Sequence, residues 1–145
     1  MTMTDLEIAR VNLKGHSICL CKDGEFFTDD GRGISPMIRI LEEERVLRGY
    51  SVADMVVGKA AAMLFVKAGI IEVYAEVMSS AARDYLRQHN ITCEWNTLTQ
   101  RIINRAGTDI CPMEKTVADI SDAQEGYKAL RAEVQRRQSY NERHN

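Results

Sequence analysis

The sequence predicts a single α/β domain with a mixed sheet, and two patterns carry this prediction. The segments 17–21 and 24–28 form a hairpin around the turn Lys22-Asp23-Gly24. From residue 52 onward the pattern alternates, in the order strand 52–57, helix 60–68, strand 72–77 and helix 80–89. Because such alternation is typical of parallel β-α-β structure, we expect the sheet to combine antiparallel and parallel strands.

The chain is long enough for one domain of ordinary size. Its 145 residues are 45% hydrophobic and 28% charged, which is close to average globular usage. A chain of this length buries enough apolar surface to fold without disulfide or metal cross-links. We expect the domain to span residues 1–134, followed by a polar tail at 135–145 that lacks a core face and frays.

Helix-start signals predict most of the remaining elements. A short helix opens the chain, and Ser35 as N-cap with Pro36 should start a helix that runs to about Arg48. Further helix starts are indicated by Pro112 and by a capping box formed by Asp122 and Glu125.

Apolar patterning predicts how three segments are buried. The helix at 60–68 is apolar on every side except Lys67, so it should be buried all round. Alternation at 91–95 predicts an edge strand that is exposed on one face. Cys19 and Cys21 lie two apart on a strand, which suits a shared core face and does not suit a disulfide between them.

Charge and cysteine usage exclude several partner classes. The 19 Lys and Arg are interspersed with 21 Asp and Glu, which leaves a formal charge of -2 and no basic face for a nucleic acid backbone. The longest apolar stretch, 60–66, is too short to cross a bilayer, and the first ten residues lack an export signal. We therefore expect a cytoplasmic protein without a membrane partner, whose four cysteines are reduced.

The first candidate site is the turn at Gly58 and Lys59, which follows the strand at 52–57. In open α/β sheets, ligands bind beyond the carboxyl ends of the strands, where helix N-termini present free N–H groups. A lysine in the first helical turn opposes the helix dipole at a cost of about 0.3–1 kcal/mol, so Lys59 favours a bound phosphate or carboxylate. The alternative is a lysine that simply extends into water.

The second candidate site is the turn at 76–80. Ser79 and Ser80 place two hydroxyls at the start of the next helix, and Glu76 lies near the end of the preceding strand. The two hydroxyls could donate hydrogen bonds to a polar ligand beside Glu76. In the alternative interpretation, one of the serines is only the N-cap of the helix.

A third group of candidate residues lies just before the helix that starts at Pro112. Cys111 directly precedes this proline, and thiols at helix N-termini are often nucleophilic. The sequence places none of the three histidines in a recognisable arrangement with Cys111, so a packing or capping role is the alternative.

Three sequence runs carry a resemblance to a known family. The runs VVGKAAA, EVYAEVMS and INRAGTDICPMEK, together with the order of elements, resemble a small prokaryotic family of uncharacterised proteins over about residues 15–130. That family has a cytidine deaminase-like fold without the zinc ligands. The resemblance implies a three-layer α-β-α sandwich with a mixed sheet, and it implies no particular activity.

The resemblance also implies that hydrolytic deamination is absent. Zinc deaminases place a His or Cys, and two residues later a catalytic Glu, at the start of the first buried helix, and a P-C-x-x-C at the next helix start. The matching positions here are Lys59 and Ala61, then Met78, Ser79 and Ala82. An ammonium, a hydroxyl and a methyl group cannot hold zinc, so no metal and no cofactor is expected. The alignment also brings Lys59 and Ser79 together.

These observations predict a non-deaminating domain that binds a small anionic ligand, nucleotide-derived or sugar phosphate, at two helix N-termini. One alternative is a Cys111-dependent transferase or hydrolase, assisted by Asp109 or a histidine. Another is a homo-oligomeric module whose exposed edge or helix face recruits a partner. The predicted contact residues are Gly58, Lys59, Ser79 and Ser80, and the predicted rim residues are Glu76, Asn104, Arg105, Asp109 and Cys111.

Overall fold

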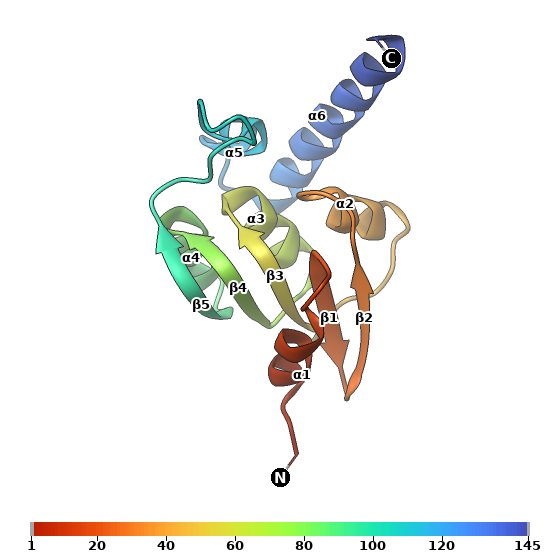
Figure 1. Cartoon of the computed structure of the whole chain (residues 1–145), viewed down its shortest axis with the longest axis vertical. Coiled ribbons are helices and arrows are strands. Elements are labelled where there is room, and N and C mark those ends of the chain that lie inside the picture. Colours follow the sequence, from red (N-terminus) through yellow and green to blue (C-terminus); the bar gives the residue numbers. More distant parts are fainter. Residues whose placement is uncertain (1, 145) are drawn as a thin grey trace.

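The computed structural model describes residues 2–144 and is built on a five-stranded sheet with the order β2-β1-β3-β4-β5 (Figure 1). β1 pairs antiparallel with β2 and with β3, whereas β3, β4 and β5 run parallel. The predicted α/β class with a mixed sheet is therefore confirmed. The strands are β1 (Ile18–Lys22), β2 (Glu25–Asp29), β3 (Ser51–Val57), β4 (Glu72–Ser79) and β5 (Thr92–Thr99).

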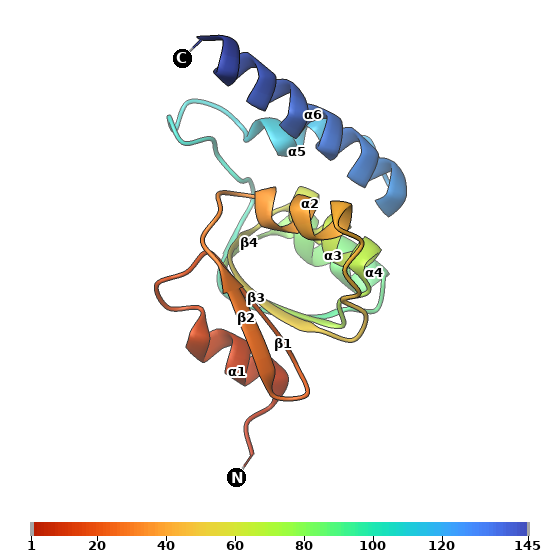
Figure 2. The ribbon, with the colours of Figure 1, turned by 90° about the vertical axis from the view of Figure 1, so that its right-hand side faces the viewer.

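Helices cover both faces of the sheet, which gives three layers. Figure 2 shows α1 on one face and α2, α3 and α4 on the other. No helix within residues 2–144 is long and apolar enough to cross a membrane. The helices are α1 (Asp5–Asn12), α2 (Ser35–Glu42), α3 (Lys59–Ala68), α4 (Ser80–Gln88), α5 (Pro112–Val117) and α6 (Ala123–His144).

The main core lies between the sheet and α3. Every residue from Ala60 to Phe65 is buried, and α3 packs against α4 and α6, which confirms the prediction of an all-round buried helix. A smaller core lies on the α1 face, where Cys19 and Cys21 are buried beside Leu6, as their shared strand face predicted. β5 forms one edge of the sheet, also as predicted.

α2 differs from its prediction at both ends. Its N-cap is Ile34 instead of Ser35, and it ends at Glu42 instead of near Arg48. Three consecutive glutamates at 42–44 place negative charge at the C-terminal end of the helix, which the helix dipole disfavours. The chain turns there because Glu44 takes a left-handed conformation with φ of 56°.

The last helix extends through the segment that the sequence predicts to fray. α6 continues to His144, although the side chains from 135 to 143 are all exposed. Figure 1 shows this end of α6 projecting beyond the rest of the domain. Residue 145, the last of the predicted tail, lies outside the described residues.

Candidate functional site

A carboxylate from α5 occupies the start of α3, the first predicted site. Glu114 Oε1 accepts a hydrogen bond from Lys59 N at 2.7 Å, and Oε2 accepts one from Ala60 N at 3.0 Å. These N–H groups lack partners within the helix, and the helix dipole favours a negative charge beside them. The chain thus supplies its own anion here, from a residue 55 positions away.

Gly58 makes room for this carboxylate. A Cβ at position 58 would lie 2.3 Å from Oε1 and 2.5 Å from Cδ of Glu114. The backbone of Gly58, with φ of -99° and ψ of -176°, is open to any residue. Glycine is therefore needed for space and not for its conformational freedom.

The side chain of Lys59 makes the reciprocal contact from α3 to α5. Its Nζ donates to the carbonyl oxygens of Val117 at 2.9 Å and Ala118 at 3.2 Å. These carbonyls end α5, where a cation is favoured by the helix dipole. The protein therefore holds the ammonium group of Lys59, and each helix caps an end of the other.

The environment of Glu114 is not that of a solvent-exposed carboxylate. Burial raises the pKa of this carboxyl above its ordinary value, and the amides of Ala60 and Lys59 and the Lys59 ammonium offset only part of the rise. Glu114 still accepts two amide hydrogen bonds. Its side chain thus locks α5 onto the start of α3.

Ser79 closes the start of α4, the second predicted site. Its buried hydroxyl accepts a hydrogen bond from Ala82 N at 3.0 Å, which confirms the N-cap alternative. Ser80 Oγ donates to Thr99 O over a longer distance of 3.4 Å. The cap makes the two serines unequal in their expected effect on stability.

We expect Ser79→Ala to lower the free energy of unfolding by about 1–2 kcal/mol, because the buried Ala82 N–H loses its acceptor. Ser80→Ala is the matched control and should cost less than about 0.5 kcal/mol, since its hydrogen bond is long. Urea denaturation measures both changes. Equal losses in the two variants would contradict the special role of Ser79.

A pocket of about 340 Å³ lies at these two helix starts. Lys59 and Ser79 both line it, as the alignment implies, and Ile102 and Ile110 contribute apolar surface. Glu114 also lines the pocket and engages the amides of Lys59 and Ala60. The pocket therefore offers an anion fewer donors than the sequence predicts.

The residues at the implied zinc-ligand positions do not fit a zinc ion. Lys59 is a donor, Ser79 caps a helix, and Ala82 carries only a methyl group. Among residues 2–144, no three side chains of His, Cys, Asp or Glu gather where they could hold a metal ion.

Glu76 lies apart from Lys59 and Ser79. Its carboxylate accepts a hydrogen bond from the Tyr74 hydroxyl at 2.9 Å, and it borders a different pocket with Tyr74 and Arg10. The Arg10 guanidinium lies 4.1 Å from the centroid of the Tyr74 ring. Since Arg10 belongs to α1, Glu76 sits on the α1 side of the sheet and not at the helix starts.

The predicted residues around Cys111 mainly stabilise their own turn. Asn104 Oδ1 accepts from Thr108 N at 3.0 Å, and Asp109 forms an ion pair with Lys115. The hydrogen bond from Lys115 holds the pKa of Asp109 below its usual range. Cys111 is half-buried and is the N-cap residue of α5, without a side-chain capping bond.

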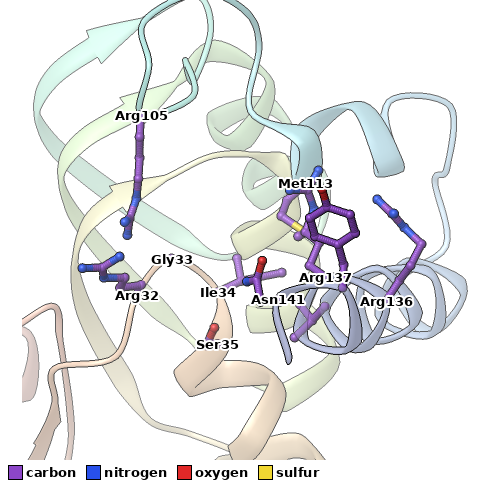
Figure 3. A pocket seen from close by; sticks show the side chains of 11 residues that line it. Arg32, Gly33, Ile34, Ser35, Arg105, Met113, Arg136, Arg137 and Asn141 are labelled. Atoms are coloured by element: carbon purple, nitrogen blue, oxygen red, sulfur yellow. The ribbon is translucent and has the colours of Figure 1, made fainter. Parts of the chain in front are cut away.

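A larger pocket of about 730 Å³ lies between the start of α2, α5 and the end of α6 (Figure 3). Arg105 is the only residue of the predicted site that lines it. Figure 3 shows Arg32 and Arg105 on one side, with their guanidinium groups facing one another. We call this the arginine pocket because four arginines line it, namely Arg32, Arg105, Arg136 and Arg137.

The four arginines differ in their partners. Glu133 Oε1 lies 2.6 Å from Arg136 Nη2 and 2.9 Å from Arg137 Nε, so one carboxylate serves both guanidinium groups. Within residues 2–144, neither Arg32 nor Arg105 forms an ion pair. One end of the pocket therefore carries two positive charges that pair with no carboxylate in the described part of the chain.

These features define a three-layer α/β domain in which the helix starts after β3 and β4 are capped by the chain's own side chains. The chain belongs to the family described as "TM1506: Domain of unknown function (DUF1893)", whose model matches residues 9–134. This confirms membership of an uncharacterised family. No curated protein matches the chain.

Three solved structures resemble the chain to different degrees. A DUF1893 family protein (TM1506) from Thermotoga maritima matches with a TM-score of 0.80 and 21% identity, covering 92% of each chain. A diaminohydroxyphosphoribosylaminopyrimidine deaminase/5-amino-6-(5-phosphoribosylamino)uracil reductase from Thermotoga maritima has a TM-score of 0.41 and 17% identity, over 55% of this chain and 29% of that one. The dCMP deaminase of cyanophage S-TIM5 has a TM-score of 0.44 and 13% identity, over 62% and 92%.

Proposed function

We propose that the protein is a non-deaminating domain that binds a small anionic ligand in the arginine pocket, between Arg32 and Arg105. The two guanidinium groups line one pocket without an acidic partner among residues 2–144, and this observation carries the proposal. Arginine keeps its charge at any ordinary pH, so two such groups repel unless an anion lies between them. Phosphate and carboxylate match the guanidinium geometry with paired hydrogen bonds.

The start of α2 supports the same proposal. Ile34 is its N-cap and provides no side-chain hydrogen bond, and no acidic residue lies in the first turn. The positive end of this helix dipole is therefore not countered by an acid of its own, in contrast to α3, where Glu114 fills that place. Ile34 and Ser35 both line the arginine pocket, so the helix start adds to its positive potential.

Calorimetric titration with inorganic pyrophosphate at low salt tests this site. We expect the wild-type protein to bind, and Arg32→Gln or Arg105→Gln to weaken binding at least tenfold, because each removes charge-assisted hydrogen bonds worth about 1.5–3 kcal/mol. Both variants should keep the stability of the free protein, since the change removes repulsion between exposed cations.

Arg48→Gln is the matched control for loss of one positive charge. Arg48 is exposed and precedes β3, and it does not line the arginine pocket. This variant should bind pyrophosphate like the wild type. Absence of binding to the wild-type protein, or equal affinity in all four proteins, would overturn the proposal.

A further inference from the structure

The arginine pocket is larger and chemically less uniform than an anion alone requires. Its volume of about 730 Å³ lies within the range of pockets for small organic ligands, about 300–1,000 Å³. Ile34, Met113 and Val134 give it half-buried apolar side chains. A ligand that fills the pocket must therefore carry an apolar part as well as an anionic group.

We infer that the ligand is a nucleoside phosphate, whose phosphate lies between Arg32 and Arg105 and whose planar base lies against the opposite wall. This inference rests on the proposed function and names the class of ligand. Figure 3 shows the two ends apart, with Arg32 and Arg105 on one side, Met113 and Arg137 on the other, and Asn141 beside Ile34 between them.

The wall opposite Arg32 and Arg105 has the groups that bind a base. Tyr140 offers an aromatic ring that is half exposed, with 52% of its surface accessible, and Met113 offers a thioether that packs well on planar rings. The planar guanidinium group of an arginine also stacks on bases. Arg137 forms an ion pair with Glu133, so it is less suited to bind a phosphate than Arg32 and Arg105 are. Asn141 has both a donor and an acceptor, as the edge of a base requires.

A sugar phosphate matches the Arg32 and Arg105 end of this pocket, and Ser35 and Asn141 could bind some of its hydroxyls. It leaves the apolar surface of Ile34, Met113 and Val134 without a complementary group. A base covers the same surface and gains about tenfold in affinity or more from stacking on aromatic side chains. The ring should therefore contribute to affinity separately from the phosphate.

Titration of the full chain with AMP, CMP, ribose 5-phosphate and inorganic pyrophosphate tests this inference. We expect AMP or CMP to bind at least tenfold tighter than ribose 5-phosphate. Tyr140→Ala should weaken the nucleotide about tenfold and leave ribose 5-phosphate unchanged, whereas Arg105→Gln should weaken both. Tyr140→Phe keeps the ring and should therefore bind the nucleotide more tightly than Tyr140→Ala. Gln138→Ala, which lies on α6 outside the pocket, is the matched control and should bind like the wild type.

The outcomes separate this inference from the proposed function. Equal affinity for the nucleotides and ribose 5-phosphate, or an equal loss for both in Tyr140→Ala, would overturn the assignment of the base. Pyrophosphate binding that depends on Arg32 and Arg105 would then still support the anion site. If neither pyrophosphate nor any nucleotide binds, the proposed function fails and the ligand class fails with it.

Discussion

Gly58→Ala is expected to lower the free energy of unfolding by about 2–4 kcal/mol, although the backbone at this position accepts alanine without strain. The added Cβ would lie 2.3 Å from Glu114 Oε1, so the carboxylate must leave its place. Its hydrogen bonds with Lys59 N and Ala60 N break together, and two helix-start amides lose their charged partner. Urea denaturation measures the loss.

A double-mutant cycle with Glu114→Ala isolates the cause. In that background no carboxylate meets the new methyl group, so Gly58→Ala should be neutral or stabilise by about 0.4–1 kcal/mol through the unfolded state. The coupling energy should therefore reach about 2 kcal/mol or more. If Gly58→Ala costs the same in both backgrounds, the contact with Glu114 is not what requires glycine.

Local patterns were sufficient to predict much of the fold. The hairpin, the buried α3 and the start of α5 at Pro112 depend on residues close together in the chain, and all three are confirmed. The Asp122 cap is confirmed as well, since its Oδ2 accepts from Glu125 N at 2.9 Å. Periodicity and capping act within one or two helical turns, so a single sequence contains their signal.

The group that binds the amides at the start of α3 comes from a distant part of the chain, so local sequence patterns do not predict it. Lys59 at a helix start indicated a bound anionic ligand, whereas the structure places the carboxylate of Glu114, from 55 residues away, at the helix-start amides. Glu114 is the third residue of α5, where a glutamate often caps its own helix. The structure shows that it caps α3 instead, because α5 packs against the start of α3.

The arginine pocket was largely missed for the same reason. Arg32 lies in a glycine-flanked turn, Arg105 in a second turn, and Arg136 and Arg137 in a polar segment that was expected to fray. None of these local settings is unusual for an arginine. Only the folded chain brings residues 32–35, Arg105 and the end of α6 to one pocket.

The side chain of Asp54 lies on the core side of β3. It pairs in register with Ile18 of β1 and Ala75 of β4, and both of these belong to the main core. Residues that are paired in register lie on the same face of the sheet, so Asp54 faces this core. Within residues 2–144, Asp54 forms no ion pair. Burial raises the pKa of Asp54 to about 7, although amide hydrogen bonds from Val56 and Met55 lower it.

The raised pKa makes the protein less stable as the pH rises. The folded state holds a proton on Asp54 up to about pH 7, whereas the unfolded state releases it near the ordinary aspartate pKa of 3.8. Between these values the folded state binds more protons, so Asp54 contributes stability below about pH 4 that is lost as the pH approaches 7. Above pH 7 the carboxylate is charged in both states and the loss is complete.

Asp54→Asn should remove this pH dependence, because the amide has nearly the same shape and never ionises. We expect the variant to match the wild-type protein near pH 4 and to exceed its free energy of unfolding by on the order of 2–4 kcal/mol at pH 8. Urea denaturation from pH 4 to pH 8 measures the difference between the two proteins. Other carboxyls, such as Asp5 and Asp109, have lowered pKa values and therefore make both proteins more stable as the pH rises. This contribution is the same in both proteins, so it cancels when one stability curve is subtracted from the other.

Asp119→Asn is the matched control, because Asp119 is exposed and its substitution should change stability by less than about 0.5 kcal/mol at any pH. A gain at high pH that is confined to Asp54→Asn would assign the destabilisation to the half-buried Asp54 on β3. Parallel curves for Asp54→Asn and the wild-type protein would instead mean that Asp54 has the same pKa in the folded and unfolded states. In that case water would solvate the Asp54 carboxylate in the folded protein, and its place opposite Ile18 and Ala75 would not raise its pKa.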